Sequence, residues 1–90
     1  MPIYNILVTT EKRKIVNYNA KRTVLVIRNR SVENNVEISE TPLPDAPYFT
    51  VLPNQAYTFI KALGDDTTLE LWAKTTSGEA VVEIVEFYEK

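Results

Sequence analysis

Short apolar segments, each only a few residues long, dominate the hydrophobic pattern of this chain. Seven or eight of them are rich in Val, Ile, Thr, Tyr and Phe and are bounded by Asn, Pro, Gly or Asp, which is typical of β-strands. They run approximately over residues 4–10, 14–18, 23–29, 36–39, 48–52, 57–61, 68–74 and 80–88. Strands at such close spacing predict one all-β domain over residues 1–90, an antiparallel β-sandwich that is either jelly-roll-like or immunoglobulin-like.

Turn residues separate the expected strands. Residues 33–35 (Glu-Asn-Asn) and 77–78 (Ser-Gly) are predicted to form hairpin turns, and residues 64–66 (Gly-Asp-Asp) a loop tip. Residues 41–47 hold three prolines, which exclude a helix and a central strand, so we expect a stiff crossover between sheets or a projecting arm. Little or no helix is expected, because the best helical candidate, residues 59–63, is ended at once by Gly64.

Three of the strongest strands carry apolar side chains on both of their faces. They lie within residues 3–8, 24–27 and 81–88. A domain of this size has only one core, so the second face of these strands needs a cover of its own. We expect either a flap, such as the proline-rich segment, or an interface with another subunit.

Five residues are predicted to contact a partner. They are Tyr4, Ile6 and Val8 of the N-terminal strand, which is expected to project, together with Trp72 and Tyr88. Aromatic side chains combine a large apolar area with a polar tip, and such anchors dominate the energetics of interfaces. Trp72 points away from Leu71 in its strand, and the sequence leaves open whether it belongs to the core or to an interface.

The composition removes most catalytic and cofactor chemistry. The chain has no Cys and no His, so it has no disulfide, no thiolate nucleophile and no imidazole base. Two glycines allow neither a P-loop nor a dinucleotide-binding fingerprint. The acids most worth weighing as catalytic groups are expected to be solvated surface charges: Asp65, Asp66, Glu70, Glu83 and Glu86. We therefore predict no enzyme, no catalytic or metal-binding residues and no cofactor.

Charge is segregated along the chain. Residues 1–30 hold seven Lys or Arg against one acid, a net charge of +6, and the remaining residues carry −8. The simplest interpretation is that complementary strands meet within one fold. The alternatives are a head-to-tail contact between subunits or an anionic partner such as single-stranded nucleic acid, which would use a basic patch around Tyr18. That patch would consist of Lys12, Arg13, Lys14, Lys21 and Arg22. The acidic overall balance argues against nucleic acid.

Residues 22–31 (RTVLVIRNRS), 35–38 (NVEI) and 52–59 (LPNQAYTF) together resemble small β-sandwich proteins of tailed-phage particles. In that layout an apolar strand ending in Arg-Asn is followed by a short strand, a Leu-Pro-Gly turn and a closing hairpin, and the similarity covers residues 22–88. Asn54 stands where glycine is usual, and asparagine tolerates the same left-handed backbone. The resemblance implies a virion component such as a capsid decoration protein or a head or tail accessory domain, often oligomeric and without enzymatic activity.

The sequence therefore predicts a structural protein that self-associates or docks on a capsid or tail surface through a sheet face and a terminal arm. The alternative is a module that binds single-stranded nucleic acid or carbohydrate on one sheet face. The N-terminal residues lack the features of a secretory signal, and no apolar run approaches the roughly 20 residues that span a bilayer. We expect no membrane partner and a location in the virion, or in the host cytoplasm before assembly.

Overall fold

The computed structural model describes residues 3–43 and 48–89, and it confirms the predicted all-β sandwich. Its strands are β1 (Ile3–Val8), β2 (Arg13–Val16), β3 (Arg22–Asn29), β4 (Val36–Ser39), β5 (Phe49–Val51), β6 (Ala56–Ile60), β7 (Leu71–Thr75) and β8 (Ala80–Tyr88). A single 3-10 turn, η1 (Lys61–Leu63), follows β6 and ends at Gly64, whose φ of 94° is left-handed. The weak helical signal in the sequence therefore corresponds to one turn that stops where the glycine allows it.

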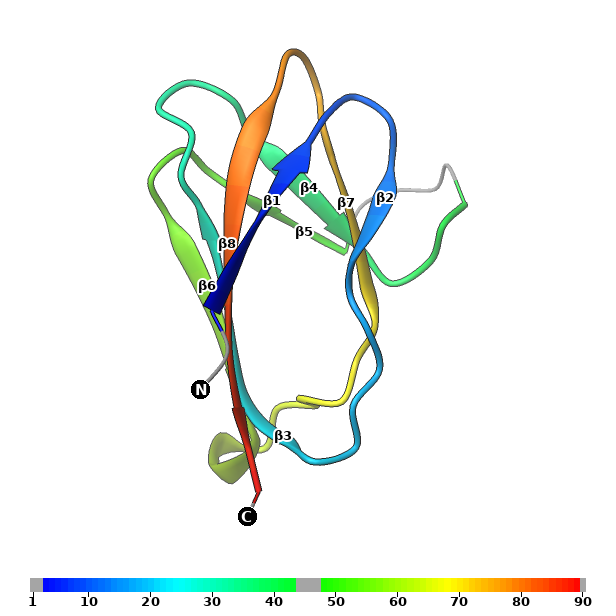
Figure 1. Cartoon of the computed structure of the whole chain (residues 1–90), viewed down its shortest axis with the longest axis vertical. Helices are drawn as coiled ribbons and strands as arrows, with labels where there is room; N and C mark the ends of the chain where they lie inside the picture. The colour runs from blue at the N-terminus through cyan, green and yellow to red at the C-terminus, as the bar shows by residue number, and fades with distance from the viewer. Residues whose placement is uncertain (1–2, 44–47, 90) are drawn as a thin grey trace.

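The strands form two four-stranded antiparallel sheets that pack face to face (Figure 1). Sheet A has the order β1-β8-β3-β6, and sheet B has the order β2-β7-β4-β5. The first strand thus pairs with the last, the second with the seventh, the third with the sixth and the fourth with the fifth. This order is that of a jelly roll and not of an immunoglobulin domain, so the strand pairing decides between the two predicted alternatives.

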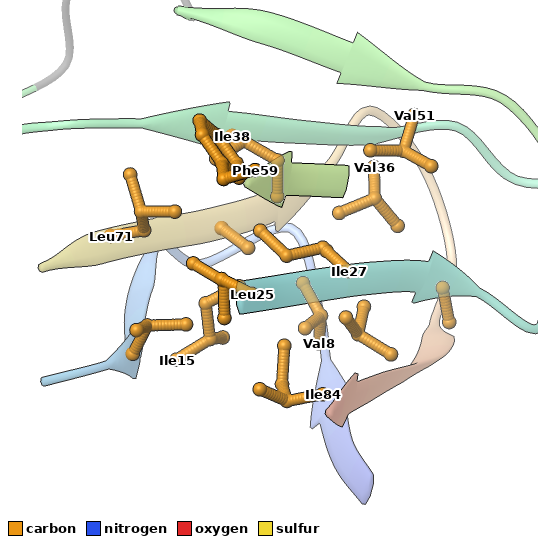
Figure 2. Packing of buried hydrophobic residues seen from close by; sticks show 14 residues of the cluster. Val8, Ile15, Leu25, Ile27, Val36, Ile38, Val51, Phe59, Leu71 and Ile84 are labelled. Carbon is orange, nitrogen blue, oxygen red and sulfur yellow. The ribbon is translucent and has the colours of Figure 1, made fainter. Parts of the chain in front are cut away.

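The core lies between the two sheets and receives side chains from every strand (Figure 2). Side chains of a strand point to opposite faces in turn, so one set per strand enters the core. The exception is β2, where the pairing register shifts and the consecutive residues Ile15 and Val16 are both buried. Its buried members are Val8, Ile15, Val16, Leu25, Ile27, Val36, Ile38, Val51, Phe59, Leu71, Ala73, Ala80, Val82 and Ile84. β3 and β8 lie at the centre of sheet A, and most of their inward-pointing side chains are fully buried.

Two predicted hairpins are wrong, because consecutive strands of this fold mostly belong to different sheets. Residues 33–35 lead from β3 in sheet A to β4 in sheet B, and residues 77–78 lead from β7 in sheet B to β8 in sheet A. The two turns touch each other, since Asn34 Nδ2 donates a hydrogen bond to the Glu79 carbonyl over 2.7 Å. Gly78 has a φ of 69°, which explains the glycine in the second turn.

The proline-rich segment is not a crossover between sheets, because it connects β4 and β5, which pair within sheet B. Its residues 44–47 lie outside the described residues. The described part is held by Lys12, whose Nζ donates hydrogen bonds to the carbonyls of Thr41 and Leu43. This part of the segment therefore lies beside the loop that precedes β2.

Asn54 adopts the left-handed backbone that its place in the sequence suggested, with a φ of 61°. Its N–H donates to the carbonyls of Asn29 and Ser31 over 3.0 and 3.1 Å. The fully buried side chain of Asn29 in turn donates from Nδ2 to the carbonyls of Asn34 and Val51. One buried amide thus ties the β3–β4 connection to the end of β5 at this end of the sandwich.

Candidate interaction face

The three strands that are apolar on both faces lie side by side in sheet A, in the order β1-β8-β3. Their second faces therefore join into one surface on the outside of the sandwich. In the ladder, Val85 lies between Ile3 and Val26, and Val24 lies between Phe87 and the edge strand β6. We call this surface the outer face, and its residues are Ile3, Val24, Val26, Ile60, Val85 and Phe87.

The outer face is open to solvent. Ile3 is 54% exposed and Phe87 is 42% exposed, whereas Val24, Val26 and Val85 are half-buried by their neighbours in the sheet. The expected flap does not account for this surface, because the described part of the proline-rich segment lies beside Lys12. Contiguous exposed apolar surface is a common feature of interaction sites.

A polar row crosses sheet A beside the outer face. Glu83 lies opposite Asn5 on one side and opposite Arg28 on the other. Arg30 Nη1 also forms an ion pair with Glu83 Oε2 over 3.3 Å. The row therefore brings a cation and an anion next to each other at the border of the apolar surface.

Beyond the polar row the surface becomes apolar again and is hollowed. Leu7 lies opposite Val81, and both side chains are at least 40% exposed. They line a hollow of about 320 Å³ together with Arg30 and Val32, of which Val32 is 78% exposed. The hollow is large enough to receive an apolar side chain of a partner.

The structure corrects the face of β1 that was predicted to form contacts. Tyr4, Ile6 and Val8 point inward, and Val8 is fully buried in the core. The residues of β1 that reach solvent are the alternate ones, Ile3 and Leu7. β1 is also paired with β8 along its length and does not project as a free arm.

The two aromatic residues predicted to form contacts lie away from the outer face. Trp72 is on the outside of sheet B and half-buried, with Lys14 Nζ 5.1 Å from its ring centroid, so it is not a core residue. Tyr88 ends β8, is 38% exposed and donates a hydrogen bond from its hydroxyl to Glu86 over 2.7 Å. Neither residue belongs to the surface defined above.

The predicted basic patch is divided between different parts of the molecule. Arg13 Nη1 donates to the Leu7 carbonyl, and Lys14 pairs with Glu70 over 3.1 Å, both at β2. Lys21 lies in the connection before β3, where its carbonyl accepts a hydrogen bond from the Glu89 N–H over 2.8 Å. Arg22 is buried, with an exposed fraction of 1%. The structure therefore does not gather these cations into one surface for an anionic partner.

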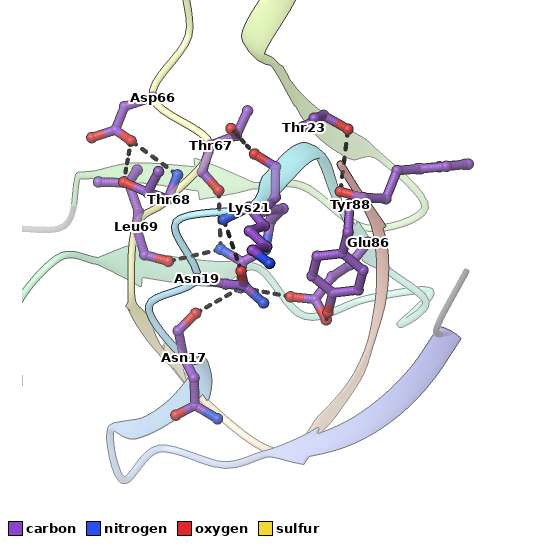
Figure 3. A network of polar contacts seen from close by, with 12 residues as sticks. Asn17, Asn19, Lys21, Thr23, Asp66, Thr67, Thr68, Leu69, Glu86 and Tyr88 are labelled. Carbon is purple, nitrogen blue, oxygen red and sulfur yellow. Dashed lines mark hydrogen bonds and ion pairs between the residues drawn. The ribbon is translucent and has the colours of Figure 1, made fainter. Parts of the chain in front are cut away.

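Arg22 and Glu86 form a buried ion pair between β3 and β8 (Figure 3). Arg22 Nη2 lies 2.7 Å from Glu86 Oε1 and also donates to the Asn17 carbonyl, while Nη1 donates to the carbonyls of Thr67 and Leu69. Two predictions are corrected, since Arg22 is not part of a binding patch and Glu86 is not a solvated charge. The guanidinium instead fixes two connections at the base of the sandwich.

Some of the segregated charges meet within the fold, which supports the simplest interpretation of the charge pattern in part. Cations of the first thirty residues pair with acids of the remaining chain in three places: Lys14 with Glu70, Arg22 with Glu86 and Arg30 with Glu83. The separations are 3.1, 2.7 and 3.3 Å. Part of the positive charge of residues 1–30 is therefore neutralised by acids of the later chain.

Tyr4 packs against this ion pair, and burial raises its pKa from 10.0 to about 12, with the negative charge of Glu86 adding to the rise. The folded protein therefore favours the neutral phenol. The resulting stability is fully present below pH 10 and is lost as the pH rises through about 12.

Tyr4→Phe should remove this alkaline loss of stability in unfolding measurements between pH 9 and 12. Tyr18→Phe should lose stability with rising pH as the unchanged protein does. Equal alkaline profiles for Tyr4→Phe and the unchanged protein would contradict this.

Comparison of the chain with family models, curated proteins and solved structures found no match. Within residues 3–43 and 48–89, no helix is long and apolar enough to cross a membrane. The same residues contain no group of three or more acids placed to hold a metal ion. What the described surface offers is an apolar sheet face with a charged row at its border, an arrangement suited to contact with another protein surface.

Proposed function

We propose that this chain is a non-enzymatic structural protein that self-associates through the outer face of sheet A. The observation that carries the proposal is the adjacency of three doubly apolar strands, which leaves Ile3 and Phe87 exposed on one contiguous surface. Burial of apolar area is the main favourable term in protein association. A second copy that packs on this face would remove that area from water.

A second copy fits this face because its charges are self-complementary. Arg28 and Glu83 are directly opposite each other in the ladder, so the border of the outer face carries both signs. A two-fold axis brings each residue of one copy to the matching patch of the other, so it can place Arg28 of one copy beside Glu83 of its partner. Two sheets packed in this way keep their strands nearly aligned, which is the usual geometry of stacked sheets.

The assembly we propose is a tailed-phage particle, in which the chain acts as a capsid decoration protein or a head or tail accessory domain. Two points support this assignment. Residues 22–88 resemble small β-sandwich proteins of such particles, and the jelly roll is an architecture that viral capsid domains share with lectins. The architecture supports the proposal only by analogy, because one fold serves many functions.

Light scattering coupled to size exclusion tests self-association. The chain has a mass of 10.3 kDa, and we expect a molar mass of at least twice this value that persists on dilution through the micromolar range. The mass should change little between low and high salt, because apolar burial dominates the contact. A mass of one chain at every concentration would contradict the proposal.

A further inference from the structure

A second surface feature is a cluster of aromatic rings between the edge strands β5 and β6. Phe49 and Tyr57 stack with their ring centroids 4.2 Å apart at an interplanar angle of 25°, and Tyr48 meets Phe49 edge-on at 5.1 Å. Phe59 lies beneath them and is buried. We call the three outer rings, Tyr48, Phe49 and Tyr57, the aromatic corner.

The exposure of the aromatic corner exceeds what closing the sandwich requires. Phe59 is only 4% exposed and Phe49 is half-buried, so these two rings seal the opening between the sheets. Tyr48 and Tyr57 nevertheless remain 53% and 44% exposed. Exposed tyrosine rings that are already held by contacts with another ring are preferred anchors for a ligand, because little side-chain freedom is lost on binding.

The charged groups that act on the Tyr48 hydroxyl are acids. Glu40 directly follows β4, and the Tyr48 N–H donates to the Ile38 carbonyl of that strand over 2.7 Å, which brings Glu40 close. Asp65 is held at the end of β6, where its Oδ2 accepts a hydrogen bond from the Ile60 N–H over 2.9 Å. Burial raises the pKa of Tyr48 most, followed by Glu40, by the neighbouring Tyr57 and then by Asp65 and Asp66.

The nearest basic residue along this part of the chain does not offset these acids. Lys61 forms an ion pair with Glu89 over 2.5 Å, and its charge is therefore balanced by the C-terminal segment. Lys12 also lies near Glu40, because its Nζ donates hydrogen bonds to the carbonyls of Thr41 and Leu43. Within the part of the chain that the structure describes, neither lysine forms an ion pair with Glu40, Asp65 or Asp66, so the aromatic corner combines ring faces with nearby carboxylates. A neutral ligand would make use of the rings alone, whereas a cation makes use of both the rings and the carboxylates.

We propose that the aromatic corner binds a cationic side chain, a lysine or arginine presented by a basic segment of a partner protein. A cation over an aromatic ring is attracted by the negative face of the ring, and surrounding carboxylates raise its local concentration. The chain already makes this contact within itself, where Lys14 Nζ lies 5.1 Å from the centroid of Trp72. The site lies at the edges of the two sheets and does not depend on self-association through the outer face.

Titration of the full chain with a hexalysine peptide at low salt, followed by NMR of the aromatic protons, tests this inference. We expect the ring resonances of Tyr48 and Tyr57 to shift. Tyr48→Ala should weaken binding about fivefold, since a cation and an exposed ring attract each other by about 1 kcal/mol. Tyr48→Phe should bind like the unchanged protein, because the ring and not the hydroxyl holds the cation. The matched control Tyr18→Ala removes another exposed tyrosine and should have no effect.

The carboxylates are tested in the same way. Glu40→Gln should weaken binding and reduce its dependence on salt, whereas Glu33→Gln, at the other end of β4, should not. The inference is overturned if the peptide does not bind, or if Tyr48→Ala and Glu40→Gln bind as tightly as their controls. It is also overturned if neutral maltohexaose, and not hexalysine, shifts the rings, since that outcome identifies a sugar site. The molar mass of Tyr48→Ala, which we expect to equal that of the unchanged protein, reports separately on the outer face.

Discussion

Replacing Glu86 with alanine should lower the free energy of unfolding by about 3–5 kcal/mol, a large part of the 5–15 kcal/mol that stabilises a typical domain. The reason is that Arg22 is 1% exposed and would keep its charge in the interior without a carboxylate partner. The Nε of Arg22 is buried and already lacks a hydrogen-bond partner. Loss of the carboxylate would therefore leave the guanidinium with still fewer of its N–H groups satisfied. Urea unfolding at neutral pH, followed by tryptophan fluorescence, measures the change.

Glu70→Ala is the matched control for this prediction. Glu70 pairs with Lys14 over 3.1 Å, but the two side chains are 45% and 41% exposed, so the loss should stay below about 1 kcal/mol. A double variant, Arg22→Met with Glu86→Leu, should recover part of the stability, because it removes the buried charge together with its partner but also removes the hydrogen bonds that Arg22 donates to three backbone carbonyls. Equal losses for Glu86→Ala and Glu70→Ala would show that the buried pair has no special role.

Introducing a lysine at Val26 should reduce the assembly to single chains and raise its dissociation constant by at least about 100-fold. Val26 lies on β3, between Val85 of β8 and Thr58 of β6, and so near the middle of the outer face. In a single chain the lysine reaches water, whereas in the face-to-face pair two ammonium groups would be buried without partners at a cost of several kcal/mol. Sedimentation equilibrium over a range of concentrations gives the dissociation constant.

Thr50→Lys serves as the control, since Thr50 is an exposed residue on the outside of sheet B. It adds the same charge to the opposite side of the sandwich and should leave the molar mass unchanged. Val26→Lys should also melt within a few degrees of the unchanged protein at concentrations where both are single chains. If Val26→Lys retains the mass of the unchanged protein, the outer face is not the contact surface.

The positions of the strands and the two-faced character of three of them could be predicted from local pattern alone. Alternation placed Trp72 opposite Leu71 and placed Glu86 with Val82 and Ile84, and the structure agrees in both cases. Alternation does not say which of two apolar sets faces the core. On β1 both sets carry apolar residues, Ile3 and Leu7 in one and Tyr4, Ile6 and Val8 in the other, and the tertiary packing makes the second set internal.

Long-range pairing is what the sequence could not supply. Residues 77–78 look like a hairpin turn because the local signal is the same whether the chain returns to its own sheet or crosses to the other. Arg22 and Glu86 look like surface residues because charged side chains are rarely buried, and their partnership depends on the contact between β3 and β8. The aromatic corner likewise joins β5 and β6, which belong to different sheets.

The most direct test of the outer face is the accessibility of its methyl groups to a soluble paramagnetic gadolinium chelate, measured by methyl NMR on the full chain. At concentrations where the chains associate, the methyls of Ile3, Val26 and Val85 should be shielded from the chelate. Dilution should expose all of them, and in Val26→Lys the methyls of Ile3 and Val85 should be exposed. The methyl of Thr50 on sheet B should stay accessible throughout. Strong relaxation of Ile3 and Val85 at every concentration would contradict the proposal that a second copy covers this face.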